Sequence, residues 1–207
     1  MILSKKQLAV LLSKMRTFER PDVQLEQYPT DGEVAADILW NAKMAGELNG
    51  RTVADLGCGT GILGIGALAL GARHVTFLEV DPRTFPALMA NLSKLEADTG
   101  KKYGNYEIVE GDAAAFGGRV DLVVQNPPFG TRERGADVEF LRVAMRAAPV
   151  VYSLHKTSTE EHLKRVVAGA GRHLAALTRY EFPLKQTMTH HEKRIERIET
   201  SCLRIVS

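Results

Sequence analysis

The stretch Asp55-Leu56-Gly57-Cys58-Gly59-Thr60-Gly61 stands between a short apolar run and a longer run of helical character. Glycines let the backbone turn sharply and approach a ligand closely, because they carry no Cβ. The free N–H groups at the start of the following helix favour anionic groups. This stretch therefore predicts a strand, a ligand-binding turn and a helix, which together form the first unit of an α/β fold.

Short β-branched runs alternate with longer helical runs from Arg51 onward. This alternation predicts the α/β class, with a doubly wound, mainly parallel seven-stranded sheet and helices on both faces. Two late apolar runs joined by a polar stretch predict an antiparallel C-terminal hairpin at the sheet edge. The expected strands are Thr52–Asp55, His74–Val80, Tyr106–Glu110, Val120–Gln125, Val150–His155, Leu174–Phe182 and Ile195–Val206. The expected helices, two of them N-terminal to the sheet, are Lys5–Thr17, Glu33–Glu47, Gly57–Leu70, Pro82–Glu96, Val138–Ala148 and Thr159–Val167.

The composition excludes several classes of protein. Of the 207 residues, 44% are hydrophobic and 25% are charged, which is not the balance of a disordered or low-complexity chain. The longest nearly uncharged apolar run, Ile62–Ala72, is too short to span a bilayer, and we expect no export signal. Cys58 and Cys202 give neither a disulfide framework nor a metal pair. We therefore expect a soluble, cytoplasmic protein without a membrane partner.

The glycine turn has two interpretations. Asp55-x-Gly57-x-Gly59-x-Gly61 resembles motif I of class I S-adenosylmethionine (SAM) methyltransferases, which have a Rossmann-like fold. In that motif the glycines make room for the methionine moiety, and a carboxylate lies near its ammonium group. The overlapping Gly59-x-Gly61-x-x-Gly64 also satisfies the dinucleotide fingerprint, which alone is weak evidence. SAM is the preferred cofactor, with S-adenosylhomocysteine as its product, and NAD is the alternative.

Three carboxylates follow the second and third expected strands, at the sheet edge where ligands bind in such folds. Glu79 and Asp81 end the second strand, and a carboxylate there can accept hydrogen bonds from both ribose hydroxyls of an adenosine. Asp81 precedes a proline and has a second interpretation as a helix cap. Asp112 resembles the acidic residue near the adenine amino group, and it too has the helix cap as its alternative.

The turn Asn126-Pro127-Pro128-Phe129 follows the fourth expected strand and points to the chemistry. It resembles the signature of methyltransferases that act on planar amino groups, whose lone pair is delocalised and therefore poorly nucleophilic. The Asn126 side-chain oxygen and the Pro127 carbonyl can accept the two N–H bonds of such an amine. Phe129 offers a face for stacking, and the prolines stiffen the turn. We predict Asn126, Pro127 and Phe129 as catalytic residues and Pro128 as a substrate contact.

Two further segments, Leu25–Thr30 and Val151–Lys156, narrow the resemblance. Together with the proline turn, they are similar to the small archaeal and eukaryotic methyltransferase-like family that makes N6-methyladenosine in small-subunit ribosomal RNA. The resemblance implies that Gln27, Tyr28 and Thr30 close over SAM. It also implies a division into residues 1–50, a helical extension and cofactor lid, and residues 51–207, the methyltransferase domain, within one structural unit. Eukaryotic members of the family pair with a small zinc-containing activator protein.

Several of these residues also have simpler interpretations. Thr30 and Glu33 have the spacing of a capping box that starts a helix. His155 and Lys156, after the fifth expected strand, either contact a phosphate or border the base pocket, or they form a solvated strand end. Adjacent histidines, His190 and His191, have no Cys or carboxylate partner at ligand spacing, so we predict no metal site.

A net charge of +2 is too small to indicate a nucleic-acid partner, so local clusters must carry that prediction. The first twenty residues are basic, and further basic residues are expected around the mouth of the proline turn. Any single one of them is more often a solvated surface charge. The candidate RNA contacts are Lys5, Lys6, Lys14, Arg16, Arg20, Arg132, Arg134, Lys185, Lys193 and Arg194.

Three other functions are weighed against an RNA adenine N6-methyltransferase. The same proline turn serves methylation of guanine N2 or of a protein glutamine, although release-factor methyltransferases usually carry a helical N-terminal domain, and only about 50 residues precede the glycine turn here. An NAD-dependent reductase leaves the proline turn unexplained. An inactive RNA-binding scaffold has no reason to keep Asp55, Glu79 and Asn126.

Overall fold

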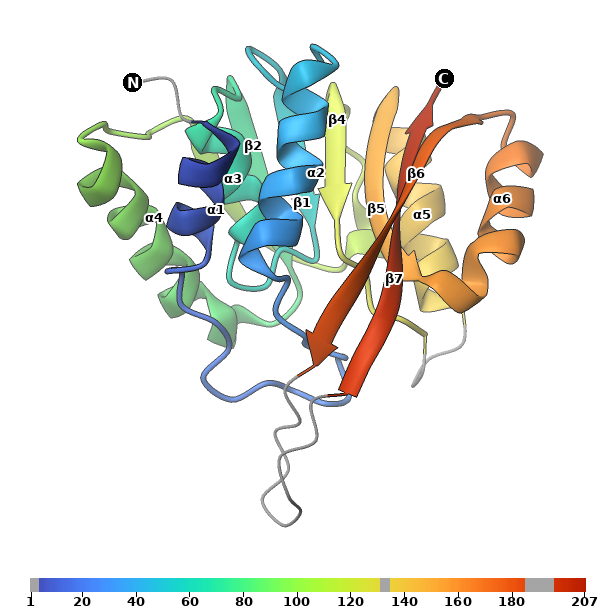
Figure 1. The fold of residues 1–207 in the computed structure, drawn as a ribbon, viewed down its shortest axis with the longest axis horizontal. Helices are drawn as coiled ribbons and strands as arrows, with labels where there is room; N and C mark the ends of the chain where they lie inside the picture. The colour runs from blue at the N-terminus through green and yellow to red at the C-terminus, as the bar shows by residue number, and fades with distance from the viewer. Residues whose placement is uncertain (1–3, 131–134, 185–195) are drawn as a thin grey trace.

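A seven-stranded sheet forms the centre of the fold in the computed structural model, which describes residues 4–130, 135–184 and 196–207 (Figure 1). The strand order is β3-β2-β1-β4-β5-β7-β6. The first five strands are parallel, and β7 runs antiparallel to both β5 and β6. The sheet confirms the predicted fold class and its C-terminal hairpin. The strands are β1 (Thr52–Leu56), β2 (His74–Glu79), β3 (Tyr106–Glu110), β4 (Leu122–Gln125), β5 (Val150–Lys156), β6 (His173–Leu184) and β7 (Glu196–Val206).

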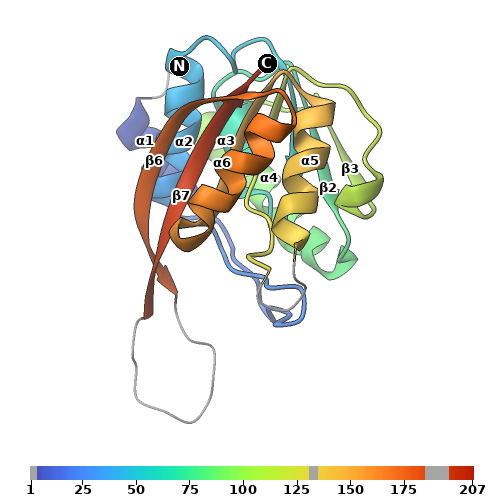
Figure 2. The same ribbon diagram turned by 90° about the vertical axis from the view of Figure 1, so that its right-hand side faces the viewer.

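Helices cover both faces of the sheet, and successive strand residues alternate between two hydrophobic cores. In β4, Leu122 and Val124 pack with α1–α4, whereas Val123 packs with α5 and α6 (Figure 2). In the described part of the chain, no helix combines the length and apolarity needed to cross a membrane. The helices are α1 (Lys5–Leu12), α2 (Gly32–Met44), α3 (Ile62–Ala69), α4 (Phe85–Thr99), α5 (Ala136–Ala147) and α6 (Glu160–Gly169), with short 3-10 turns η1 (Pro82–Thr84), η2 (Ala113–Ala115) and η3 (Thr157–Thr159).

The first helix ends earlier than the sequence predicts, at Leu12 instead of Thr17. A tertiary contact accounts for the difference, because the Asn91 side chain on α4 bonds to both backbone groups of Arg16. Its oxygen accepts the Arg16 N–H at 2.7 Å, and its amide donates to the Arg16 carbonyl at 3.0 Å. The chain then continues below the end of the sheet at which β4 points, and enters α2 (Figure 1).

The start of α2 corrects a second prediction. Asp31 is the N-cap, and its carboxylate accepts the N–H groups of Glu33 and Val34 at 2.8 and 3.2 Å. The predicted capping box between Thr30 and Glu33 is therefore wrong. The Thr30 hydroxyl instead accepts a hydrogen bond from Asn126, across the sheet edge.

Candidate active site

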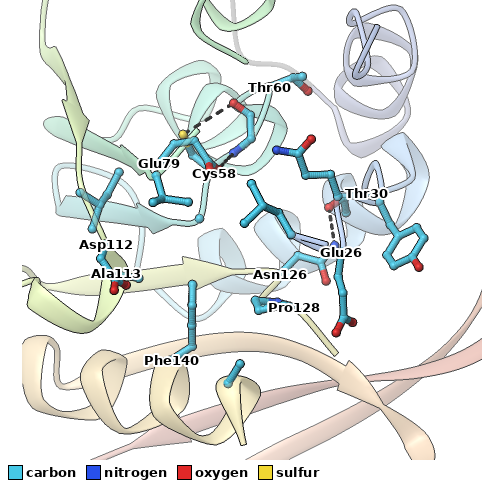
Figure 3. A pocket seen from close by; sticks show the side chains of 18 of the residues that line it. Glu26, Thr30, Cys58, Thr60, Glu79, Asp112, Ala113, Asn126, Pro128 and Phe140 are labelled. Carbon is cyan, nitrogen blue, oxygen red and sulfur yellow. Dashed lines mark hydrogen bonds between the residues drawn. The ribbon is translucent and has the colours of Figure 1, made fainter. Parts of the chain in front are cut away.

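A cavity of about 300 Å³ lies at the carboxyl edge of the sheet. Its walls include the turns after β1, β2, β3 and β4 and the first turns of α5. The segment between α1 and α2 closes the remaining side. Figure 3 shows Glu79 and Asp112 on one side of the cavity, and Thr30, Glu26 and Asn126 on the other. Ligands bind at this edge in open α/β sheets, as the sequence predicts.

The glycine turn after β1 is possible only with glycines. Gly57, Gly59 and Gly61 have φ values of 67°, 53° and 85°, in the left-handed region that disfavours side chains. A Cβ at Gly61 would lie 2.1 Å from a methyl carbon of Leu88, so the turn also packs too closely on α4 for any larger residue. Gly57 and Gly59 line the cavity, whereas Gly61 shapes the turn from behind.

Asp55 lies buried below this turn, with 1% of its surface exposed. Its carboxylate accepts the Gly64 N–H at 2.7 Å. Burial raises the pKa of Asp55 to about 7, with a smaller contribution from the negative charge of Glu79 and an opposing one from the Gly64 N–H. Near neutral pH this carboxyl group is therefore about half protonated, and a nearby cation would favour its ionised form.

The raised pKa gives a prediction on stability. The folded protein holds the Asp55 proton up to about pH 7, whereas the unfolded chain releases it near 3.8. The folded state thus binds more protons between these values, and the free energy of unfolding falls by about 4 kcal/mol as pH rises through the window. Asparagine cannot ionise, so Asp55→Asn lacks this pH-dependent loss of stability. The substitution is therefore expected to raise Tm more at about pH 8 than at about pH 5. Thermal unfolding without SAM at the two pH values measures the difference, and an equal shift at both would contradict the burial effect.

Glu79 and Asp81 separate in the structure. Both oxygens of Glu79 face backbone donors, with the Gly59 N–H at 2.8 Å and the Asp81 N–H at 3.0 Å, and the side chain lines the cavity. Asp81 does not line the cavity. Its carboxylate caps η1, pairs with Arg83 and accepts the Gln27 side-chain amide at 2.8 Å. Glu79 is therefore placed to contact a ligand in the cavity. Asp81 instead anchors the segment between α1 and α2, which covers the cavity.

Asp112 forms the helix cap that was its alternative interpretation, and it also lines the cavity. Its carboxylate accepts the Ala114 N–H at 2.9 Å and so caps η2. The same residue lines the cavity beside Ala113, on the wall formed by β2 and β3 (Figure 3). Capping holds the carboxylate in place without removing it from the cavity.

The amide of Asn126 is oriented by Thr30. Its nitrogen donates to the Thr30 hydroxyl at 3.0 Å, and its oxygen is buried without a hydrogen-bond partner among the described residues. A buried acceptor left unpaired costs free energy, so it indicates a donor that arrives with a ligand. Asn126 and Pro128 line the cavity, and Pro127 lies between them in the turn.

Phe129 is held by two residues of the segment between α1 and α2. Its N–H donates to the Glu26 carboxylate at 2.9 Å, and its ring stacks against Tyr28 with centroids 6.3 Å apart and planes at 17°. Lys156 lies 5.7 Å from the ring centroid. Phe129 is 8% exposed and does not line the cavity, so its neighbours largely cover the ring in this structure.

His155 corrects a third prediction. Its ring is 1% exposed, which rules out both a phosphate contact and a solvated strand end in this structure. The Nε2 atom lies 2.6 Å from the Ser153 hydroxyl, which also accepts the Gln125 amide at 2.8 Å, and Nδ1 lies 3.8 Å from Asp137. Burial lowers the pKa of His155 and so favours its neutral form. The ring belongs to a polar network below the proline turn.

Sequence reasoning missed some residues of this site. Glu26 is the only non-glycine residue of the described chain with a positive φ, at 50°, and nothing in the sequence around it indicated that conformation. Glu139 and Phe140 line the cavity from α5, whereas the sequence indicated only that they belong to a helix. The candidate RNA contacts Arg132, Arg134, Lys185, Lys193 and Arg194, and the pair His190 and His191, lie outside the described residues.

The basic residues near the N-terminus lie within the described part of the chain, and they differ in the contacts that they make. Lys5 pairs with Asp37 on α2 and so stabilises the packing of the first two helices. Lys6, Lys14, Arg16 and Arg20 are exposed. They form no direct contact with the cavity, so they can act only on a ligand that extends beyond it.

The sheet order, the glycine turn after β1, the carboxylate ending β2 and the proline turn after β4 together define a class I SAM-dependent methyltransferase. The family described as Conserved hypothetical protein 95 matches residues 16–171, and the rRNA N(6)-adenosine-methyltransferase METTL5 of Danio rerio is 31% identical over 96% of this chain and 97% of its own. The chain therefore belongs to the METTL5-type family of class I methyltransferases.

Two archaeal proteins agree with this placement. An uncharacterized protein of Methanocaldococcus jannaschii is 31% identical over 99% of this chain and 94% of its own. The crystal structure of a candidate RNA methyltransferase from Pyrococcus horikoshii superposes with a TM-score of 0.88 at 36% identity, covering 100% of this chain and 98% of that one. The similarity thus extends over the whole fold, the N-terminal helices and the C-terminal hairpin included.

Proposed function

We propose that this protein transfers a methyl group from SAM to the exocyclic N6 amine of an adenosine in small-subunit ribosomal RNA. The observation that carries the proposal is the buried, unpaired oxygen of Asn126 beside a cavity of about 300 Å³. The names of the METTL5 relatives support ribosomal RNA as the substrate class. The resemblance that the sequence bears to the family supports the small subunit.

The cavity fits SAM in its chemistry. Glu79 can accept the ribose hydroxyls with the lone pairs that its backbone donors leave free. Asp55, whose pKa burial has raised, gains most from a nearby cation, such as the ammonium group of SAM. Gly57, Gly59 and Gly61 allow close approach, and Asp112 stands on the wall proposed for adenine. Gln27, Tyr28 and Thr30 would cover the bound cofactor.

The residues of the proline turn would make the amine reactive. Asn126 Oδ1 and the Pro127 carbonyl accept its two N–H bonds, which frees the nitrogen lone pair from the ring. Phe129 holds the base by stacking, with Pro128 and Lys156 beside it. SAM, when bound, supplies the methyl group and leaves as S-adenosylhomocysteine. Correct placement of the two reactants contributes most of the acceleration, and the methylated amine loses its proton to water without a strong base.

The proposal also includes partners and location. RNA is the macromolecular substrate, and the cytoplasm is the proposed location. The family resemblance adds a small zinc-containing activator protein as a partner. This partner stays a prediction, and copurification from the source cells would test it.

Two measurements test the cofactor and the substrate separately. Stabilisation against heat by S-adenosylhomocysteine but not by NAD is expected, and stabilisation by NAD alone would favour a reductase. Transfer of labelled methyl groups to small-subunit ribosomal RNA, and not to large-subunit RNA, is the second expected result. Label on a protein glutamine or on guanosine would keep the chemistry and change the substrate.

Thr30→Val is expected to lower kcat about tenfold while changing the SAM dissociation constant little. Valine cannot accept the Asn126 amide, so the amide loses the bond that keeps its oxygen toward the cavity, a loss of about 1 kcal/mol or slightly more. Thr30→Ser keeps the hydroxyl and should retain most of the rate. Steady-state kinetics and SAM titration separate the effects, because a residue that served mainly to bind SAM would raise the dissociation constant with kcat unchanged.

A further inference from the structure

A second hollow, of about 710 Å³, lies between α5 and α6 on the face of the sheet that these two helices cover. Figure 2 shows the two helices side by side at the surface. No aspartate or glutamate lines this hollow among the residues that the structure describes. Its polar lining is basic, and consists of Arg142, Arg146, His162, Arg165 and Arg172.

Helical spacing places the basic side chains on one surface. Arg142 and Arg146 are four residues apart on α5, and His162 and Arg165 are three apart on α6, so each pair projects from one helix face. All four are exposed. In the described chain, no carboxylate forms an ion pair with Arg142, Arg146 or Arg165. Glu161, which is near Arg165 in sequence, pairs with Lys164 instead.

Arg172 has a structural role and closes one end of the hollow. Its guanidinium donates to the backbone carbonyls of Met145, Ala148, Pro149 and Val206, which ties the end of α5 to the hairpin. Among the described residues, the side chains of Arg142 and Arg146 form no hydrogen bond, and Arg165 forms one, from Nε to the Glu161 carbonyl at 3.2 Å. Like charges gathered around one hollow repel one another, so this arrangement is useful only when an anion is bound.

Arginine suits oxyanions, carboxylate as well as phosphate. Its planar guanidinium pairs with phosphate through two parallel hydrogen bonds. The hollow is a surface groove along the last turns of both helices, and α5 links it to the active site, because Glu139 and Phe140 line the first cavity from the first turns of the same helix. At a rise of 1.5 Å per residue, Arg142 and Arg146 lie about 5 and 11 Å farther along α5 than Glu139.

We propose that this α5–α6 groove binds the phosphodiester backbone of the RNA substrate, at nucleotides that extend from the target adenosine along α5. The inference rests on the proposed function for the identity of the anion. The groove would add affinity and orientation outside the cavity, where contacts to phosphates position a nucleic acid without reading its sequence.

The test compares two triple variants with the same loss of charge. The groove variant carries Arg142→Gln, Arg146→Gln and Arg165→Gln. The control carries Arg51→Gln, Arg73→Gln and Lys101→Gln, which are exposed residues that precede β1, β2 and β3 and do not line the groove. Affinity for a stem–loop RNA with a long stem is measured by fluorescence anisotropy over a series of salt concentrations. The groove variant should lower the slope of log affinity against log salt by about 2–3, whereas the control leaves it nearly unchanged.

Two further arms keep the inference distinct from folding and from catalysis. Substitution of the three groove arginines by lysine keeps the charge and should keep most of the slope. A single-stranded oligonucleotide too short to reach the groove should be methylated at the wild-type rate by the groove variant. Equal slopes for the groove and control variants would overturn the proposal that the groove binds RNA. The proposal would also be overturned if the groove variant bound RNA normally but no longer bound a polyglutamate peptide. That result would indicate an acidic protein partner. Normal, groove-dependent RNA binding without methyl transfer would instead overturn the proposed function alone.

Discussion

Asn126→Ala is expected to lower kcat for methyl transfer by about 100- to 1,000-fold, the loss typical of removing one preorganised polar contact at a reacting atom. The side chain supplies the acceptor that is buried and unpaired in the free protein. Its removal leaves the amine with its lone pair delocalised. SAM affinity should change little, because the proposed cofactor contacts come from the turns after β1, β2 and β3 and from the segment between α1 and α2. Single-turnover kinetics with saturating RNA and titration with S-adenosylhomocysteine measure the two quantities.

Asn126→Asp is the matched control for this result. Aspartate keeps an acceptor at the same place but loses the N–H that the Thr30 hydroxyl accepts. We expect activity between that of the wild type and that of Asn126→Ala. Near-normal turnover of Asn126→Ala would refute the role assigned to the side chain, and equal losses of turnover and SAM affinity would make it a structural residue of the cavity.

Glu79→Ala is expected to raise the SAM dissociation constant by about 10- to 100-fold, since a hydrogen bond to a charged group contributes about 1.5–3 kcal/mol. The carboxylate would lose its contacts to the ribose, and the Gly59 and Asp81 N–H groups would lose their acceptor. Glu79→Gln keeps one acceptor oxygen and should show a smaller loss. Calorimetric titration with S-adenosylhomocysteine gives the values.

Asp81→Ala is the informative comparison, because the sequence offered both residues as ribose ligands. Asp81 lies outside the cavity and holds Gln27, so its replacement should weaken SAM binding less than Glu79→Ala does. A larger effect at Asp81 would transfer the ribose role to that residue. No effect at Glu79 would remove it from the proposed site.

The parts of the site that could be predicted are contiguous in sequence. The glycine turn and the proline turn each place their functional groups within a few residues, and the alternation of strands and helices brings both turns to one edge. The mainly parallel sheet follows from the same alternation, whereas the order of its strands was not predicted. Residue identity alone was therefore enough to bring Glu79 and Asn126 to one cavity, whereas Asp55 lies buried below its glycine turn and does not line it.

The contacts that could not be predicted join residues far apart in the chain. Thr30 and Asn126 are 96 residues apart, and Glu26 and Phe129 are 103 apart. Which polar group meets which depends on the path of the segment after α1, and Asn91 fixes that path by bonding to the backbone of Arg16. Burial of His155 likewise depends on β7, which pairs with β5 and places Ser201 opposite His155.

The central claim is tested most directly by transfer from labelled SAM to small-subunit ribosomal RNA, followed by mass spectrometry of the nucleosides, with Asn126→Ala run in parallel. The account predicts label in N6-methyladenosine with the wild-type protein and none with the variant. Label in another nucleoside, equal label from the variant, or no label in RNA that is known to be unmethylated would contradict it.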